Sequence, residues 1–191
     1  MQTKFFTGEG DLGVSHVSGK AYPKNSLALE VLGTLDELNT FLGLCRALAF
    51  EQDTTSIMRV KHKEIQAKLY ECQNFLFILQ AHIATLIFGG SLKHVIKEVH
   101  SNTLEVWIKE IDDEVPPIKN FIVPGGFELS ARVDVARAVT RRLERLLVAL
   151  SNELQISSEA VQFINRLSSF LFALARYINY LHNINEEKPD Y

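Results

Sequence analysis

Apolar residues recur at helical spacing along most of this chain. Between Ser26 and Phe50, and again between Thr54 and Phe88, they fall three or four positions apart, which is the period of an amphipathic helix. Residues 93–115 carry a shorter pattern of the same kind. A fourth pattern follows residues 124–126 and runs to Leu150, and a fifth opens at 157–159. The spacing predicts five helices and no strand ladder.

Turn-forming residues separate these helical patterns. Gly89-Gly90-Ser91 closes the second, Pro116-Pro117 ends the third, and Pro124-Gly125-Gly126 precedes the fourth. Ser26 is a candidate cap of the first helix. Gly33 interrupts that helix at a cost of about 1 kcal/mol relative to alanine, which indicates close packing or a close ligand.

The organisation expected from these patterns is one all-α domain. A helical bundle at 26–183 follows a glycine-rich segment, residues 1–25, and precedes a polar tail at 184–191 that we expect to fray. Long helices with this much apolar surface favour self-association.

Composition excludes several classes of function. A hydrophobic content of 47% and a charged content of 23% are ordinary for a globular protein, and a net charge of −3 argues against general nucleic-acid binding. Cys45 and Cys72 lie on apolar segments, as buried free thiols do in a reducing compartment. The apolar run from Phe75 to Phe88 is too short to span a membrane, and no targeting pattern opens the sequence. We therefore expect a cytoplasmic protein.

The fourth helix carries a row of arginines. Asp134, Arg137, Arg141 and Arg145 recur on one face of it. A solvated face with ion pairs to Asp134 and Glu144 is one interpretation. The other is a polyanion site, because guanidinium groups bind phosphate in a bidentate way. The preceding Pro-Gly-Gly turn and the crowding of arginines at 141–145 favour the second interpretation without deciding between them.

The glycine-rich segment is equally open to two interpretations. Its glycines and lysines fit either a disordered terminus or a loop that offers N–H groups and ammonium groups to phosphates. It contains no Walker motif. The six histidines show no spacing typical of a metal site, so no resident metal site is expected.

Four segments resemble the ATP:corrinoid adenosyltransferases of the propanediol-utilisation type. The first two are FTGEGDLGVS (6–15) and EVLGTLDELNTFLGL (30–44), which is similar to the motif E-A-Y-G-T-V-D-E-L-N-S-x-I-G-L. The third combines PPIKNFIVPGG with ARAVTRRLER. The fourth is FINRLSSFLFALARYIN (163–179), and a weaker similarity covers CQNFLFILQAHIA (72–84). These segments come in the order of the family and span nearly the whole chain.

The resemblance implies a five-helix bundle that assembles as a homotrimer, with ATP and the corrinoid bound between subunits. The implied reaction is displacement at the 5′ carbon of ATP by cob(I)alamin, which releases triphosphate and forms adenosylcobalamin. Because the reduced cobalt is the nucleophile, no catalytic triad or reactive cysteine is needed, and none is evident. A flavoprotein reductase and an adenosylcobalamin-dependent enzyme would be the protein partners.

The same resemblance assigns roles to residues on the helices. It implies that Arg141, Arg142 and Arg145 contact ATP, with Glu144 holding the cluster. Arg137 would pair with Asp36 across a subunit boundary and close the corrinoid site. Phe121 would displace the lower ligand of the cobalt. The implied adenosine contact is Asn165.

For the glycine-rich segment the resemblance implies a loop that wraps the phosphates of ATP with Mg²⁺ bound. The residues of this segment that match are Thr7, Gly10, Asp11, Gly13, Lys20 and Lys24. Here the segment also departs from the family. Glu9 places a negative charge in it, and the motif G-K-R-V-S-K reads Gly19-Lys20-Ala21-Tyr22-Pro23-Lys24. The alternative function is therefore a non-catalytic corrinoid-binding or carrier protein on the same bundle.

Overall fold

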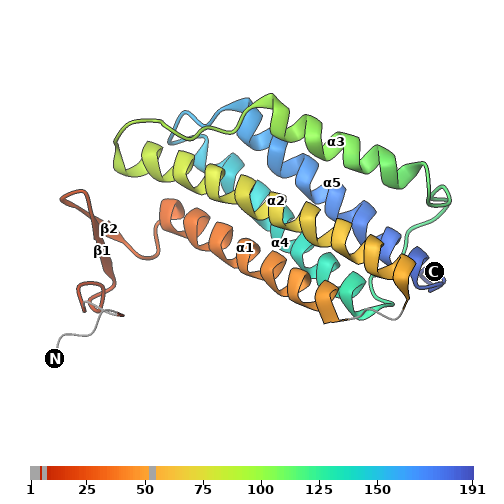
Figure 1. The fold of residues 1–191 in the computed structure, drawn as a ribbon. Helices are drawn as coiled ribbons and strands as arrows, with labels where there is room; N and C mark the ends of the chain where they lie inside the picture. The colour runs from red at the N-terminus through yellow and green to blue at the C-terminus, as the bar shows by residue number, and fades with distance from the viewer. Residues whose placement is uncertain (1–4, 6–7, 52–54) are drawn as a thin grey trace.

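Five long helices make up most of the molecule in the computed structural model, which describes residues 5, 8–51 and 55–191. Figure 1 shows them packed side by side. Their bounds are α1 Leu27–Glu51, α2 Ser56–Phe88, α3 Glu98–Asp112, α4 Glu128–Leu150 and α5 Ser158–Leu181. The all-α prediction of five helices is confirmed. In the part of the chain that the structure describes, no helix is both long and apolar enough to cross a membrane.

Side-chain caps explain where two of the helices begin. The Thr55 hydroxyl accepts a hydrogen bond from the N–H of Met58 at the start of α2, and the Ser157 hydroxyl accepts one from the N–H of Ala160 at the start of α5. Ser26 stands at the predicted cap position directly before α1, and its carbonyl accepts the N–H of Glu30. Its buried hydroxyl makes no hydrogen bond with any described residue, so the side-chain cap does not form.

The third helix starts later than the predicted residue 93. A ring nitrogen of His100 accepts the backbone N–H of Lys97 at 2.9 Å, which fixes the first turn of α3 at Glu98. Residues 89–97 form an irregular connection instead, and it begins at Gly89, whose φ of 84° ends α2.

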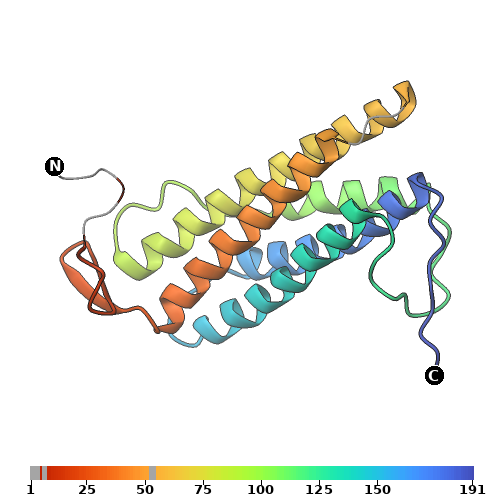
Figure 2. The same cartoon turned by 90° about the horizontal axis from the view of Figure 1, so that it is seen from below.

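A β-hairpin precedes the bundle, contrary to the expectation of no strands. Strands β1 (Val14–Val17) and β2 (Lys20–Pro23) are antiparallel, with Val17 opposite Lys20. Ser18 and Gly19 both have positive φ, at 52° and 74°, which is the backbone of a type I′ hairpin turn. Figures 1 and 2 show the hairpin standing off the bundle, beyond the start of α1 and the end of α2.

Helix α5 lies at the centre of the packing. It packs against both α4 and α3, while α1 packs against α2 and α4. Phe163 and Phe170 are fully buried on α5, and Tyr177 is nearly so, which makes this seven-residue repeat part of the core. The core positions of α5 are Ala160, Phe163, Ile164, Leu167, Phe170, Leu171, Leu174, Ala175, Tyr177 and Ile178.

Both cysteines are buried free thiols, as predicted. Burial raises the pKa of Cys45 to about 12 and raises the pKa of Cys72 as well. Neither side chain is a thiolate near neutral pH, so neither is a ready nucleophile.

Two histidines, the buried His82 and the half-buried His182, make the stability of the fold depend on pH. Burial lowers the pKa of His82, and burial together with the charge of His62 lowers the pKa of His182. The Nε2 atoms of His62 and His182 are 3.2 Å apart, and the His182 ring stacks on Phe127 with centroids 3.5 Å apart. The native state therefore favours neutral His82 and His182.

We expect the free energy of unfolding to fall as the pH drops below about 6.5, the ordinary pKa of histidine. Below that pH His82 and His182 bind protons more readily in the unfolded chain than in the native state, so protonation favours unfolding. Urea unfolding at fixed protein concentration, between about pH 7.5 and about pH 5.5, measures the loss. The loss should be smaller in His82→Gln and unchanged in the exposed control His16→Gln. An equal loss in all three proteins would contradict this origin.

Candidate functional site

A cleft opens where the first half of α4, the second half of α5 and the loop between α3 and α4 meet. It consists of two adjoining cavities of about 390 and 500 Å³. Five residues line both cavities, namely Ile118, Phe121, Arg137, Phe172 and Arg176. Phe121 is 80% exposed. An aromatic side chain this exposed, at the wall of two cavities, indicates a binding surface rather than core packing.

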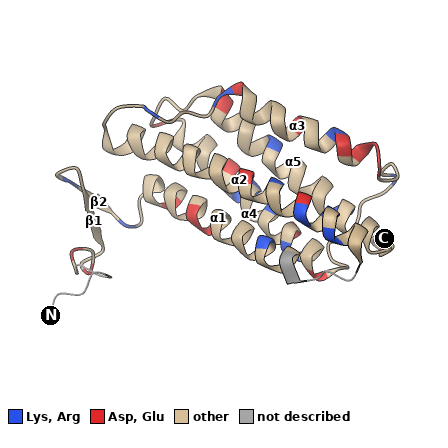
Figure 3. Cartoon of the chain, viewed as in Figure 1, with Lys and Arg blue, Asp and Glu red and all other residues tan. Residues whose placement is uncertain are grey.

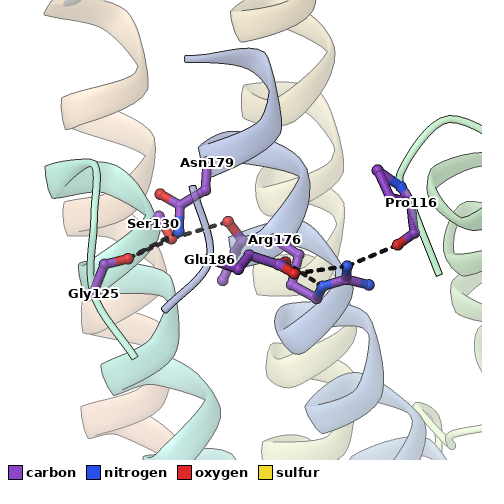
Figure 4. A network of polar contacts seen from close by, with 7 residues as sticks. Pro116, Gly125, Ser130, Arg176, Asn179 and Glu186 are labelled. Carbon is purple, nitrogen blue, oxygen red and sulfur yellow. Dashed lines mark hydrogen bonds and ion pairs between the residues drawn. The ribbon is translucent and has the colours of Figure 1, made fainter. Parts of the chain in front are cut away.

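The loop that carries Phe121 is held at its far end by Asn179 of α5 (Figure 4). The Asn179 amide donates to the carbonyl of Gly125 at 2.9 Å, and its oxygen accepts the N–H of Phe127 at 3.0 Å. Nearby, the buried Ser130 hydroxyl donates to the carbonyl of Ala175 at 2.9 Å. These bonds attach the Pro-Gly-Gly turn and the start of α4 to α5.

Arg176 holds the near end of the loop and the C-terminal tail. Its Nη2 donates to the carbonyl of Pro116 at 2.8 Å, while Nε and Nη2 donate to the Glu186 carboxylate at 2.5 and 3.1 Å (Figure 4). The N–H of Val123 also donates to the carbonyl of Glu187 at 2.8 Å. The tail therefore folds back on the loop, and the prediction that it frays was wrong.

Arg176, Asn179 and Glu186 were not predicted as site residues from the sequence. Arg176 and Asn179 belong to the segment 163–179, in which Asn165 alone was assigned a role. The available signal was an arginine and an asparagine on the apolar pattern of α5, since buried polar residues need partners. Glu186 gave no such signal because it lies in a polar tail.

On α4, only part of the Arg137 guanidinium is hydrogen-bonded within the chain. Its Nε donates to Asp134 at 2.9 Å, and its guanidinium lies 6.0 Å from the centre of the Phe172 ring. Its two Nη groups have no hydrogen-bond partner among the described residues. The ion pair to Asp134 matches the solvated-face interpretation, yet the side chain also lines both cavities.

Arg141 lies one turn further along α4 at the rim of the larger cavity. Its side chain is exposed and makes no hydrogen bond or ion pair with any described residue. Arg142 instead pairs with Glu37 of α1, and Arg145 donates to the carbonyl of Arg141 at 3.1 Å. Of these arginines, Arg141 is therefore the one whose whole guanidinium is available to a ligand.

Glu144 binds Asn165 rather than an arginine. The Asn165 amide donates to the Glu144 carboxylate at 2.8 Å and joins α5 to α4. The structure thus brings together two residues that the resemblance assigned to the ATP site. The resemblance and the solvated-face interpretation had both suggested that Glu144 pairs with an arginine, but among the described residues it pairs with none.

The glycine-rich segment forms a compact loop before the hairpin. The N–H of Asp11 bonds to Gly8, the N–H of Gly13 bonds to Gly10, and the N–H of Lys24 bonds to Gly13 at 2.9 Å. The Lys24 ammonium lies against Gly10, where a Cβ atom would come within 2.8 Å of it. Lys20 is exposed at the hairpin turn. Thr7 lies outside the described residues.

One chain does not bring all of these residues together. No hydrogen bond or ion pair among the described residues links 10–24 to Arg137, Arg141 or Arg145. Asp36 is exposed on α1 and has no ion pair with any described residue. Figures 1 and 2 place the hairpin and the C-terminus at opposite ends of the bundle. Gly33, next to Asp36, faces open space instead of the close packing that its position suggested.

The distribution of charged and metal-binding side chains limits what kind of site this can be. In the view of Figure 3 acidic and basic residues are interspersed over the helices and form no extended basic face. Within the described ranges, no three His, Cys, Asp or Glu side chains converge on a possible metal site.

Comparison with known proteins decides the family. The sequence model of the family described as cobalamin adenosyltransferase matches residues 5–178. The corrinoid adenosyltransferase of Citrobacter freundii is 35% identical over 189 residues, which cover 98% of this chain and 97% of that protein. The corrinoid adenosyltransferase of Bacillus subtilis (strain 168) is 33% identical over 181 residues, 92% of this chain and 86% of that protein. This chain belongs to the cobalamin adenosyltransferase family.

A solved structure of this family has the same fold. It is a variant PduO-type ATP:corrinoid adenosyltransferase from Lactobacillus reuteri, complexed with cobalamin and ATP. It is 34% identical, aligns with a TM-score of 0.85, and the alignment covers 98% of this chain and 100% of that one. The family match confirms the resemblance found in the sequence, and it includes both the glycine-rich segment and the arginine row.

The two glycines before α4 provide a test of how tightly the cleft loop is held. Both have positive φ, 138° at Gly125 and 98° at Gly126. A Cβ atom at Gly126 would lie 2.6 Å from the Asn179 oxygen, whereas one at Gly125 would meet open space. Gly126→Ala should therefore lower the free energy of unfolding by about 2–4 kcal/mol. The matched control Gly125→Ala should lower it by about 1 kcal/mol.

Denaturant unfolding of both variants measures the difference. Equal losses would mean that Asn179 moves freely and does not hold the turn.

Proposed function

We propose that this chain transfers the 5′-deoxyadenosyl group of ATP to a reduced corrinoid. In this reaction the cobalt electron pair of cob(I)alamin attacks the 5′ carbon, a cobalt–carbon bond forms, and the carbon–oxygen bond to triphosphate breaks. The observation that carries the proposal is Arg141, whose side chain has no partner among the described residues and lies at the rim of the cleft that Phe121 lines.

In this reaction the protein needs only to orient the two substrates and to supply fixed positive charge. The nucleophile and the leaving group both belong to the substrates, so the inert state of Cys45 and Cys72 is no obstacle. Triphosphate departs with more negative charge than it carries as an ester. Guanidinium groups that are already in place stabilise that charge without reorganisation. Arg141 fits this role, with Arg145 and Arg142 beside it.

Phe121 is proposed to act on the lower face of the corrin ring. An aromatic side chain there excludes the axial nitrogen donor and water, which leaves the cobalt four-coordinate. Loss of that donor makes the reduction of Co(II) to Co(I) easier. The support is that Phe121 is exposed while its loop is fixed at both ends, by Arg176 at Pro116 and by Asn179 at Gly125.

The complete site is proposed to form between subunits of a homotrimer. Among the described residues of one chain, the Nη groups of Arg137 have no hydrogen-bond partner and the exposed Asp36 has no ion pair, so Asp36 of a neighbouring subunit can complete the pair. The glycine-rich loop of one subunit would likewise reach the arginine row of the next. Exposed apolar side chains such as Phe77, which is 61% exposed, support association.

ATP is proposed to bind as its magnesium complex. Its phosphates would lie between the arginine row and the loop that contains Gly10, Asp11 and Gly13, where Lys20 and Lys24 supply positive charge. Thr7 belongs to the same proposed loop by its motif. Asn165, held by Glu144, would contact the adenosine.

The proposed partners follow from the reaction. A flavoprotein reductase would supply the electron that forms cob(I)alamin, and an adenosylcobalamin-dependent enzyme would consume the product. A reducing cytoplasm is the proposed location, and free Cys45 and Cys72 fit it. The non-catalytic carrier is the weaker alternative, because the arginines that would hold triphosphate are retained.

The test is turnover of cob(II)alamin with a strong reductant and MgATP, followed by the absorbance of adenosylcobalamin. Arg141→Ala should lower kcat about 10²–10³-fold, because it removes charge that stabilises the leaving triphosphate. Arg132→Ala is the matched control, since Arg132 lies on the same helix and pairs at the surface with Glu128. It should change kcat less than about twofold.

Two results would contradict the proposal. A wild-type protein that binds corrinoid tightly without turnover would favour the carrier. Unchanged turnover in Arg141→Ala would remove Arg141 from the phosphate site.

A further inference from the structure

Tyr22 ties the hairpin to the bundle. It lies in β2 opposite Ser15 and is half-buried, while its neighbours Ala21 and Pro23 are exposed. The Tyr22 hydroxyl donates to the carbonyl of Ile87 at 3.2 Å. Its ring meets Phe88 edge to face, with centroids 4.9 Å apart and an interplanar angle of 79°.

The acceptor is a carbonyl that the helix itself leaves open. Ile87 is the penultimate residue of α2, and the last four carbonyls of a helix have no partner in the next turn. Gly89 ends the helix with a bond to the carbonyl of Thr85, so the carbonyl of Ile87 is left for another donor. Tyr22 provides that donor, and its ring covers Phe88.

Within residues 14–23, Tyr22 makes the hydrogen bond and the ring contact that reach the helices. In Figure 2 the backbone of the hairpin lies beyond the ends of the helices. The glycine-rich loop depends on the same attachment. Its last residue, Gly13, accepts the N–H of Lys24, and Val14 pairs with Pro23, so the position of β2 sets the position of the loop.

We propose that Tyr22 is a positioning residue that holds the glycine-rich loop in place before ATP binds. The inference rests on the proposed function, because that loop is the one assigned to the phosphates of ATP. A loop held in advance loses less conformational entropy when the nucleotide binds, which strengthens binding without new contacts.

The motif G-K-R-V-S-K has valine at the position of Tyr22, so valine is the informative substitution. Valine keeps the β-strand propensity and removes both the hydroxyl and the ring. Tyr22→Phe removes the hydroxyl alone. His16→Val is the matched control, because His16 is an exposed hairpin residue with no hydrogen bond or ring contact to any described helix residue.

Two measurements test the proposal on the full-length protein. The first is steady-state turnover with MgATP, together with the Kd for MgATP by calorimetry. Tyr22→Val should raise the KM and Kd for ATP about fivefold, and Tyr22→Phe should fall between it and wild type. The kcat and the KM for corrinoid should stay within about twofold of wild type, because Tyr22 touches neither reacting atom.

The second measurement is tryptic cleavage after Lys20 and Lys24 in the absence of nucleotide. Tyr22→Val should be cleaved about fivefold faster than wild type and His16→Val, because the hairpin is released. Unchanged cleavage would overturn the anchor. Faster cleavage with unchanged ATP affinity would overturn its positioning role.

These outcomes separate the inference from the proposed function. Wild-type protein without turnover, but with an ATP affinity that Tyr22→Val weakens, would contradict the transferase and support the anchor. Normal turnover with an ATP affinity that Tyr22→Val leaves unchanged would support the transferase and contradict the positioning role of Tyr22.

Discussion

The bonds made by the Arg176 guanidinium are the interaction on which the cleft depends. This group is nearly buried, with 9% of the residue exposed, and a buried charge is tolerated only when it is paired and hydrogen-bonded. Arg176 meets that requirement with the carbonyl of Pro116 and the carboxylate of Glu186, which come from opposite sides of α5 in the sequence. One cation therefore fixes a loop and a tail that share no helix. Without it, the loop that presents Phe121 would have one attachment fewer.

The cations around the cleft differ in how far the chain itself satisfies them. Arg176 is paired through both Nε and Nη2 and has a structural role. Arg137 is paired through Nε alone, because Asp134 lies one turn before it, and Arg141 has no side-chain partner among the described residues. Charges that a protein leaves unpaired next to a cavity are the ones available to an anionic ligand or to a neighbouring subunit. Arg176 therefore stabilises the fold, whereas Arg137 and Arg141 keep the unpaired groups that the proposed function assigns to a neighbouring subunit and to the substrate.

Most of the fold could be predicted from the helical periodicity of the apolar residues. The second and fifth helices were predicted to within two residues at the ends marked by Thr55, Gly89 and Ser157, because cap and breaker residues act locally. The hairpin was missed because strands of four residues give too short an alternation to stand out. The third helix was predicted to begin too early, since its start depends on a bond between Lys97 and His100 that apolar spacing does not reveal.

The site residues likewise fall into those that sequence motifs predicted and those that only the structure revealed. The arginine row, Phe121 and the glycine-rich loop were visible as motifs, since their residues are close in sequence. Arg176 and Asn179 were not, because their partners Pro116 and Gly125 lie 60 and 54 residues away from them in the sequence. Glu186 was not, because the tail gave no pattern. Tyr22 was read as a departure from a motif, and its contact with Ile87 became visible only in three dimensions.

The most direct measurement is complementation between subunits that carry different defects. Asp36→Ala and Arg137→Ala proteins, each impaired alone, are unfolded together, refolded as a mixture and assayed for adenosylcobalamin formation. If each site takes Asp36 from one subunit and Arg137 from its neighbour, mixed assemblies contain some intact sites and activity returns. A mixture no more active than its two components would contradict a site shared between subunits.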